Sequence, residues 1–364
     1  MAIDNKDKKI LNVPHLRFPE FSGEWEMVSL QDIATINPKS DPLQNTFIYI
    51  DLEAVEKGEL RKIQEIMREE APSRAQRVID NNDILFQCVR PYQKNNYIHR
   101  ILNTSNQQWV ASTGYAQIRT TELPNYIYHL LNTDEFNRKV MVRCTGSSYP
   151  AINSEDLATI HLYYTPDKKE QLKISRLLDL LDKRIATQNK IIEKLQSLIK
   201  GLRVCCMQRV YGNNVYLSEI AQIYQPQTIS STELTEDGFL VYGANGIIGK
   251  YKDYNHETEQ ICITCRGNTC GMVNYTKPMS WITGNAMVIN TDKYQDKVCK
   301  RYLYHYLSAY NFNSIISGSG QPQIVRTPLE KLKITLPTIS EQKQKAIIFD
   351  KIQDKIDINH KVLN

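Results

Sequence analysis

The sequence contains no stretch of about 18 uninterrupted apolar residues, the length that a membrane-spanning helix requires. Its opening, MAIDNKDKKILNV, alternates charged residues with isolated apolar ones and lacks the apolar stretch and small-residue cleavage site of a secretory signal. These two absences exclude a membrane span and predict a cytoplasmic protein. The eight cysteines are therefore expected to be reduced thiols, not a disulfide framework.

Residues for several kinds of catalysis are also missing. No Pro-Pro pair occurs, so the Asn/Asp-Pro-Pro-Tyr type of motif that a DNA adenine methyltransferase needs is absent. His256 and Glu257 lack the second histidine of a zinc protease, and Tyr251 stands where a P-loop would have Ser or Thr. The Cys-x-x-Cys at 262–265 has no second ligand pair nearby to complete a tetrahedral zinc site. We therefore expect this chain to have no catalytic residues and to bind no cofactor or metal.

The composition is that of a globular protein with more than one core. The chain has 364 residues, of which 41% are hydrophobic and 23% charged, and this length exceeds what one core usually organises. The formal net charge of +5 is compatible with a polyanionic partner but does not require one. Two domains with connecting elements are expected.

The chain contains one pattern twice. YIYHLL at 126–131 is repeated as YLYHYL at 302–307. TGSSYPAI at 145–152 is repeated as SGSGQPQI at 317–324, and the two offsets are nearly equal. A similar string opens each copy (LQDIATI and LSEIAQI), and a Glu-Gln pair follows near its end. Each copy predicts an opening segment, a β-rich body, a short aromatic helix, a Gly-Ser loop, a strand and a long helix. The tyrosines and histidines of the short helices are expected to pack inside. The alternative is a gene duplication that produced two cores without a common function.

Both long helices carry a heptad seam. Apolar residues alternate at steps of three and four, with Gln188 in the one gap of the first helix and Asn359 in the equivalent gap of the second. A shared polar position that specifies register predicts that the two helices pair as a coiled coil, whereas the alternative is that each packs on its own domain. The seam is predicted to contain Leu178, Leu181, Ile185, Gln188, Ile192, Leu195, Ile199 and Leu202, with Phe349, Ile352, Ile356, Asn359 and Leu363.

The first seam is long enough to separate two domains by about one turn of duplex DNA. It covers 24 steps of roughly 1.5 Å, or about 36 Å, and one turn of B-DNA is roughly 34–36 Å. The second seam extends only one position past Asn359, so it is expected to pair with part of the first.

Several short strings in a fixed order carry a family resemblance. They are HLRFPEF at 15–21 with Trp25, Glu170-Gln171 leading into Leu178, Leu181 and Ile185, IEKL at 192–195, YGANGIIG at 242–249 and CRGNTCG at 265–271. Through them, nearly the whole chain resembles the specificity subunits of Type I restriction-modification enzymes. The resemblance implies two target-recognition domains, each reading one half of a bipartite DNA site, joined by two helices that pack antiparallel.

The resemblance also implies partners. Methyltransferase subunits and motor-endonuclease subunits would dock on this chain and use S-adenosylmethionine, ATP and magnesium for adenine methylation and cleavage. The expected fold is α+β, with two similar β-rich domains and a pseudo-two-fold internal repeat. The predicted parts are a polar lead (1–15), a first recognition domain (16–168), a spacer helix (169–210), a second recognition domain (211–338) and a second spacer helix (339–364).

Polar residues on loops are the candidates for DNA contacts, because base edges are read through hydrogen bonds and phosphates attract Lys and Arg. In the second domain, a loop with Arg266, Asn268 and Thr269 follows a β-type run and is the best base-reading candidate, although Gly-Asn is also an ordinary turn pair. The glycine-rich segment before it is interpreted as a turn. It contains Asn245 and is followed by Lys250 and Lys252, which are predicted to contact phosphates.

In the first domain, Arg90 is predicted to occupy the place of Arg266. Further candidates are Tyr92 and Lys94 beside it, Arg74 and Arg77 before it, and Ser148, Ser319 and Gln321 in the two Gly-Ser loops. The alternatives are a solvated charged face and simple turns. A different function for the whole chain is a two-domain scaffold that binds only proteins, whose binding would be indifferent to DNA sequence and salt.

Overall fold

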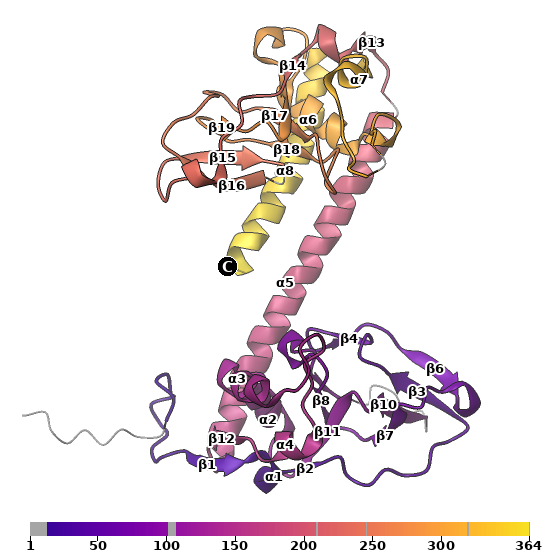
Figure 1. Ribbon diagram of the computed structural model, residues 1–364, viewed down its shortest axis with the longest axis vertical. Helices are drawn as coiled ribbons and strands as arrows, with labels where there is room; N and C mark the ends of the chain where they lie inside the picture. Colours follow the sequence, from indigo (N-terminus) through magenta and orange to yellow (C-terminus); the bar gives the residue numbers. More distant parts are fainter. Residues whose placement is uncertain (1–12, 101–106, 209, 245, 319, 364) are drawn as a thin grey trace, which may run out of the picture. The chain divides into compact units, whose positions relative to one another are not determined.

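The computed structural model describes residues 13–100, 107–208, 210–244, 246–318 and 320–363. The chain divides into two compact units, residues 1–184 and 185–364 (Figure 1). Within the described ranges, no helix combines the length and apolarity that crossing a bilayer demands. The expected mixture of helices and strands is confirmed in both units.

The first unit contains two four-stranded sheets. Its elements are β1 (Glu26–Ser29), α1 (Leu30–Ile33), β2 (Ala34–Ile36), β3 (Thr46–Ile50), β4 (Val55–Glu56), β5 (Glu59–Leu60), β6 (Gln64–Met67), β7 (Ala75–Ile79), β8 (Ile84–Gln87), β9 (Tyr97–Ile98), β10 (Gln108–Ser112), β11 (Tyr115–Thr120), α2 (Pro124–Leu131), α3 (Asp134–Arg143), α4 (Ser154–Ala158) and β12 (His161–Tyr164). One sheet has the order β2-β11-β8-β9 and is antiparallel; the other has the order β6-β3-β10-β7 with a parallel β3–β10 pair. Strands β1 and β12 form a separate antiparallel pair.

Apolar residues on β8 and β11 hold the first sheet against the helices. All four residues of β8 are buried, as expected for a strand covered on both faces. Phe86 on β8 meets Phe136 on α3 edge to face, with ring centroids 5.9 Å apart. The α3 helix begins where the Thr133 side chain accepts a hydrogen bond from the Phe136 backbone NH, which satisfies one free amide of its first turn. The sheet edge that carries the turn after β8 is therefore supported by a packed core.

The second unit repeats this topology. Its elements are α5 (Lys168–Gln208, shared with the first unit), β13 (Asn213–Tyr216), β14 (Gln222–Tyr224), β15 (Phe239–Gly243), β16 (Gly246–Tyr251), β17 (Ile261–Thr264), β18 (Val273–Tyr275), β19 (Trp281–Ile282), β20 (Ala286–Asn290), α6 (Lys300–Ala309), α7 (Arg326–Glu330), β21 (Lys333–Leu336) and α8 (Ile339–Leu363). The antiparallel sheet β14-β20-β17-β18 corresponds to β2-β11-β8-β9, and the pair β13–β21 corresponds to β1–β12. The parallel β15–β19 pair corresponds to β3–β10. The predicted internal repeat is thus confirmed in the strand order.

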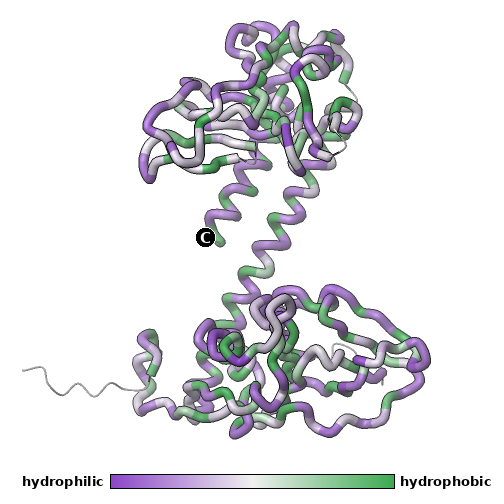
Figure 2. The backbone as a smooth tube through the Cα atoms, viewed as in Figure 1, coloured by the Kyte–Doolittle hydropathy of each residue, from purple (hydrophilic) through white to green (hydrophobic). Residues whose placement is uncertain are grey.

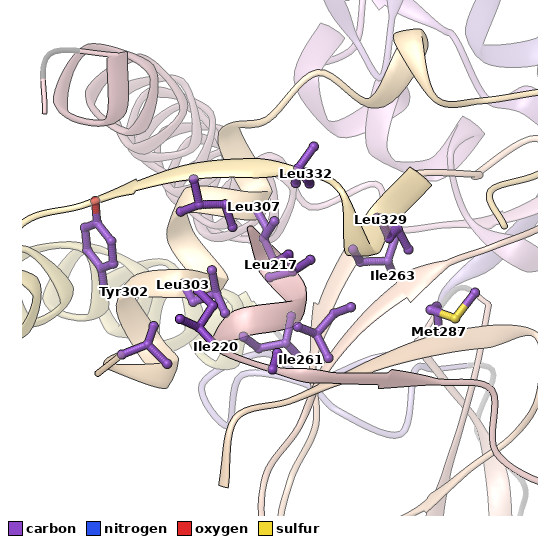
Figure 3. Packing of buried hydrophobic residues seen from close by; sticks show 14 of the residues in the cluster. Leu217, Ile220, Ile261, Ile263, Met287, Tyr302, Leu303, Leu307, Leu329 and Leu332 are labelled. Carbon is purple, nitrogen blue, oxygen red and sulfur yellow. The ribbon is translucent and has the colours of Figure 1, made fainter. Parts of the chain in front are cut away.

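One continuous core links the second sheet to its helices. Ile261 and Met287 from the sheet cluster with Tyr302 and Leu307 of α6 and with Leu217 (Figure 3). Tyr126 in the first unit and Tyr302 in the second have no exposed surface. The prediction that the aromatic residues of the two short helices pack inside is confirmed for Tyr126 and Tyr302, and Tyr128, Tyr304 and Tyr306 are partly buried against the same cores.

Within the second unit, α8 runs antiparallel to the later part of α5 (Figure 1). Gln188 donates a hydrogen bond to Asn359, and near the end of α5 the Cys206 carbonyl accepts one from Lys345 of α8 at 3.5 Å. The predicted contact between the two polar seam positions is therefore present. Apolar and polar residues alternate along both helices (Figure 2). The buried seam residues are Ile192, Ile199, Phe349 and Ile356, and Leu195, Leu202, Ile352 and Leu363 are partly buried in the same core.

The first three predicted seam residues are not part of the core that α5 and α8 share. Leu181 is 45% exposed and Ile185 48% exposed, and Leu178 lines a cavity of the first unit. The buried part of the seam therefore begins after Ile185, in keeping with the expectation that the second helix pairs with only part of the first. Because the antiparallel register places Gln188 opposite Asn359, the described part of α8 extends only about one turn beyond that pair.

Candidate nucleic-acid interface

The second unit carries a tight turn directly after the buried strand β17. The Gly271 NH donates to the Thr264 carbonyl at 2.9 Å, and the Cys270 NH donates to Gly267 at 2.9 Å. Gly267 and Gly271 have φ values of +84° and +88°, a conformation that glycine adopts without a steric cost. Between these two glycines the chain is turned outward, which leaves the side chain of Asn268 exposed.

This turn is bonded to the second Gly-Ser loop. The Gly267 NH donates to the Pro322 carbonyl at 3.0 Å, and the Ile324 NH donates to Cys265 at 3.0 Å. Arg266 and Gln321 are both exposed, and no hydrogen bond or ion pair to another described side chain engages the Arg266 guanidinium. The turn after β17 and the second Gly-Ser loop, which lie far apart in sequence, therefore lie side by side and form one edge of the second unit. Ser319 lies outside the described residues.

A third predicted segment reaches the same edge. The Thr264 hydroxyl donates to the carbonyl of Ala244, and the Asn274 amide reaches that carbonyl at 3.5 Å. Ala244 belongs to the turn between β15 and β16, so this turn lies beside the start of the Arg266 turn. Asn245, the candidate in this turn, lies outside the described residues.

The structure corrects the interpretation of the glycine-rich segment. Only its beginning is a turn, because residues from Gly246 to Tyr251 form strand β16. Lys250 therefore lies on a strand, about 13 Å along it from Gly246, with its Nζ 3.4 Å from an Asp237 carboxylate oxygen. Lys252 is exposed just beyond the strand. The two lysines lie at the opposite end of the hairpin from the edge that carries Arg266.

The first unit has the same construction. The Arg90 NH donates to the Pro150 carbonyl at 2.8 Å, and the Ile152 NH donates to Cys88 at 3.1 Å. Arg90 and Lys94 have φ values of +56° and +53°. They enclose a short 3-10 turn at Pro91–Gln93, as Gly267 and Gly271 enclose the turn in the second unit.

This geometry corrects one predicted correspondence. Val89 and Arg266 make the matching backbone bridges, to Ala151 and Gln323 respectively. Arg90 therefore corresponds to Gly267 and not to Arg266. The one-residue shift follows from the hydrogen bonds that close the turn, which residue types alone do not determine.

Aromatic and polar side chains project from this first edge. The Arg90 guanidinium lies 4.3 Å from the ring centroid of Tyr149, a cation–π geometry. Tyr149 is 63% exposed and Tyr92 is 52% exposed, and Ser148 is exposed beside Tyr149 in the Gly-Ser loop. Sequence analysis did not select Tyr149, because its stacking on Arg90 depends on how the two loops meet.

Lys94 is already paired with an acid. Its Nζ lies 2.5 Å from Asp134 and donates to the Asn132 carbonyl at 3.3 Å. The Lys94 ammonium lowers the pKa of the Asp134 carboxyl, which is almost fully exposed. A phosphate at Lys94 would have to compete with this carboxylate.

The two other basic candidates have different environments. The Arg74 carbonyl accepts from the Thr113 NH at 2.8 Å, and the adjacent Gly114 carbonyl accepts from Cys88 at 3.0 Å, so the exposed Arg74 lies beside the turn. Arg77 instead donates from Nε to the Tyr115 carbonyl at 2.9 Å and is half-buried. Burial lowers the pKa of Arg77. Within the described ranges no side chain pairs with the exposed Arg74, whereas Arg77 is held within the sheet.

Cys262 and Cys265 are part of the core of the second unit. Burial raises the pKa of the Cys262 thiol, and the Cys265 sulfur accepts a hydrogen bond from Gln225 at 3.1 Å. Within the described ranges, no group of three or more His, Cys, Asp or Glu side chains is arranged to hold a metal ion.

Comparison with known families identifies the domain that is present twice. The Type I restriction modification DNA specificity domain matches residues 22–197 and, a second time, residues 213–364. The chain belongs to this family. Each match covers one copy of the specificity domain together with its long helix.

Individual relatives agree with this assignment. The chain is 31% identical over 147 residues to the EcoprrI specificity subunit of a Type I restriction enzyme from Escherichia coli, covering 39% of this chain and 36% of that protein. It is 23% identical over 186 residues to the HindI specificity subunit from Haemophilus influenzae, covering 50% of this chain and 37% of that protein. The chain thus spans less than two fifths of the length of these relatives.

Solved structures show the same fold over most of the chain. The Type I restriction-modification S subunit from M. genitalium superposes with a TM-score of 0.66 at 16% identity, covering 93% of this chain and 92% of that one. A chain from a study of complex assembly and conformational transition of the Type I system gives a TM-score of 0.54 at 20% identity, with coverage of 96% and 94%. At these identities, the likeness concerns the specificity-domain fold alone.

Proposed function

We propose that this chain is the DNA-specificity subunit of a Type I restriction-modification complex and that each unit reads one half of a bipartite duplex target. The observation that carries the proposal is the repeated edge, in which a turn after the central strand is bonded to a Gly-Ser loop in both units. Residues that bind a partner commonly lie on loops held by a rigid scaffold, and here the sheet is the scaffold. The double family match supports the same function.

The exposed groups suit a division of labour between bases and phosphates. In the second unit, Arg266 can donate two hydrogen bonds to guanine and Asn268 can pair with adenine in the major groove. In the first unit, Arg90 supplies positive charge beside an exposed tyrosine, and Arg74 supplies a second, exposed positive charge. Phosphate contacts of this kind fix the orientation of a protein on DNA, and base contacts select the sequence.

Methylation and cleavage belong, in this proposal, to other subunits. The chain would recruit methyltransferase subunits that use S-adenosylmethionine and a motor-endonuclease subunit that uses ATP and magnesium. The described residues of these edges offer hydrogen-bond donors and acceptors for DNA. In this proposal the chain directs adenine methylation and restriction, and its partner subunits perform both reactions.

The proposal is tested by mapping methylated adenines in cells with and without this gene. We expect methylation at one two-part asymmetric sequence that disappears when the gene is deleted, and no methylation by the purified chain alone. For the purified complex, DNA affinity should fall steeply as salt rises, because each phosphate contact releases counterions. Binding that ignores both DNA sequence and salt would instead favour a protein-binding scaffold.

Single substitutions test the edge itself. Arg266→Ala should weaken binding to the specific target by roughly five- to hundredfold and relax selectivity at one base position. Lys343→Ala on α8 removes an equally exposed positive charge far along the chain from the turn and should leave selectivity unchanged. Equal effects of the two substitutions would exclude Arg266 from base reading.

A further inference from the structure

The turn after β8 contains a glutamine that sequence analysis did not select. Gln93 ends the short 3-10 turn at Pro91–Gln93, and its side chain is exposed, as is that of Tyr92 beside it. An exposed glutamine is by itself an ordinary surface residue. Gln93 differs because it accepts a hydrogen bond from a buried side chain on the strand that precedes the turn.

The buried side chain is that of Gln87, the last residue of β8, which is 2% exposed. Its Oε1 accepts a hydrogen bond from the Asn95 NH at 3.1 Å, and its Nε2 donates to Gln93 Oε1 at 2.9 Å. The backbone NH of Gln87 donates to Oδ1 of the buried Asn96 at 2.8 Å. Both ends of the Gln87 amide therefore hold the turn that follows its strand.

These hydrogen bonds fix which way the Gln93 amide faces. A backbone NH only donates, so the atom of Gln87 that meets Asn95 must be Oε1. The other end of the Gln87 amide is then the NH2 group, which also only donates, so the atom that it meets on Gln93 must be Oε1. The Gln93 Nε2 is left free of Gln87, and none of the described residues accepts a hydrogen bond from it.

A glutamine amide held in this way matches one base. Adenine offers a donor at N6 and an acceptor at N7 in the major groove, and a glutamine amide can pair with both. Gln93 Oε1 has a second lone pair for the N6 hydrogen, and Nε2 supplies the hydrogen for N7. Guanine presents acceptors at both N7 and O6 and has no hydrogen there for Oε1. Because Gln87 already holds the amide, less side-chain freedom is lost when the base binds.

The second unit places a buried polar residue at the same strand position. The backbone bridges that align the two turns make Gln87 correspond to Thr264, which ends β17 and is fully buried. The Thr264 hydroxyl donates to the Ala244 carbonyl and so holds the turn between β15 and β16. In both units, the last residue of the central strand therefore fastens a loop at the edge with its side chain.

On the basis of the proposed function, we propose that Gln93 reads an adenine in the half-site of the first unit and that Gln87 is a positioning residue that fixes its amide. The first unit then has a base-reading side chain of its own, as the second unit has Arg266 and Asn268. Arg74 and Arg90 remain for the phosphates.

Mapping methylated adenines in cells that carry variant genes tests the assignment one base position at a time. Gln93→Ala should reduce the preference for adenine at one position of one half-site by roughly five- to hundredfold and leave the other half-site unchanged. Gln93→Glu keeps an oxygen for Gln87 but loses the NH2 group, so the same position should change from adenine to cytosine, whose N4 group donates to a carboxylate. Gln64→Ala, at an exposed glutamine on the outer strand β6, should change no position.

A modified target identifies the atom that Gln93 contacts. Replacing the adenine of that position by 7-deazaadenine removes N7, the acceptor for Nε2. Binding of the full complex to this duplex should weaken roughly two- to tenfold, the effect of one hydrogen bond. A complex with Gln93→Ala should bind the modified and the ordinary duplex equally. A loss of the same size in both complexes would overturn the assignment of Gln93 to this adenine.

Gln87→Met tests the positioning role. Methionine has a similar size but makes neither hydrogen bond, so the preference at the Gln93 position should fall while every other position of the target is unchanged. Combined with Gln93→Ala, it should lower that preference no further. Thermal unfolding checks the fold of the variant, and the substitutions at the exposed Gln93 test the base contact independently. An equal loss of binding to all sequences would mean that Gln87 only stabilises the first unit.

The mapping experiment also separates this inference from the proposed function. If the unaltered chain directs methylation to a two-part sequence but the Gln93 variants change none of its positions, the role of Gln93 is wrong and the proposed function stands. If the unaltered chain directs no sequence-specific methylation, both are wrong.

Discussion

At the scale of single residues, the two units form the same turn with different residue types at its two left-handed positions. The second unit places glycine at both left-handed positions, Gly267 and Gly271, whereas the first places Arg90 and Lys94 there. A side chain in this conformation costs about 1 kcal/mol or more relative to glycine. Residues that retain such strain cluster at functional sites, which supports a DNA contact for Arg90.

Arg90→Gly should therefore separate stability from function. Relief of the left-handed strain should leave the stability of the chain unchanged or raise it by up to about 1 kcal/mol, while loss of the guanidinium should weaken DNA binding roughly five- to hundredfold. Thermal unfolding and a DNA-binding titration measure the two effects. A variant that binds DNA as well as the original chain would show that Arg90 acts only within the protein.

The matching control is Gly267→Ala. A Cβ added at Gly267 would meet no atom within 4 Å, so the substitution adds backbone strain at φ +84° without a clash. We expect a loss of about 1 kcal/mol in stability. A rise in melting temperature would contradict the left-handed conformation of this turn.

His99 predicts a pH dependence confined to the first unit. Its side chain is fully buried, its ring lies 4.8 Å from that of Trp109, and neither ring nitrogen has a hydrogen-bond partner among the described residues. Burial lowers the pKa of His99 to about 4, a shift that the nearby Asp83 opposes and Arg100 reinforces. Because the folded pKa lies below the unfolded one, stability is complete above about pH 6.5 and is lost as the pH falls towards 4.

Replacing this histidine should remove that part of the pH dependence. Between about pH 7 and about pH 4.5, the original chain should lose about 2–3 kcal/mol more stability than His99→Phe. Hydrogen exchange of amides in the first unit measures the difference. Parallel losses in both proteins would mean that His99 keeps its ordinary pKa.

At the scale of elements, the helix pair depends on one polar contact within an apolar seam. Replacing both Gln188 and Asn359 by Leu should raise the stability of the pair by about 1–2 kcal/mol while loosening its register, since polar seam residues specify alignment at a cost in stability. Thermal unfolding measures the first effect. Disulfide trapping between cysteines introduced one turn out of register measures the second. An unchanged melting temperature would count against the observed pairing.

The elements also show where sequence reasoning succeeds and stops. Heptad spacing and the shared polar gap predicted the contact between Gln188 and Asn359, because helical periodicity fixes which residues share a face. The same pattern includes Leu181 and Ile185, which are 45% and 48% exposed, since periodicity does not determine which stretch of a partner lies opposite. The glycine-rich segment was predicted to be a turn although residues from Gly246 to Tyr251 form a strand, because glycine spacing marks possible turns but does not show where a strand resumes.

At the scale of the whole molecule, duplication explains why so much could be predicted. Two copies of one pattern predicted two similar topologies, and the strand orders of both units agree with that prediction. Side-chain contacts were less predictable, because they depend on three-dimensional loop contacts. The stacking of Arg90 on Tyr149 joins loops that are far apart in sequence.

The duplication makes one last prediction about modular recognition. If each unit reads its own half-site, exchanging residues 212–338 for the matching segment of another specificity subunit should change one half of the methylated sequence and leave the other unchanged. The exchange keeps α5, α8 and their Gln188–Asn359 contact, so the spacing between half-sites should also be retained. Mapping methylated adenines with the chimera and its partner subunits measures all three properties. A change in both half-sites would mean that the two edges recognise DNA jointly, and the repeated turn would then no longer account for specificity.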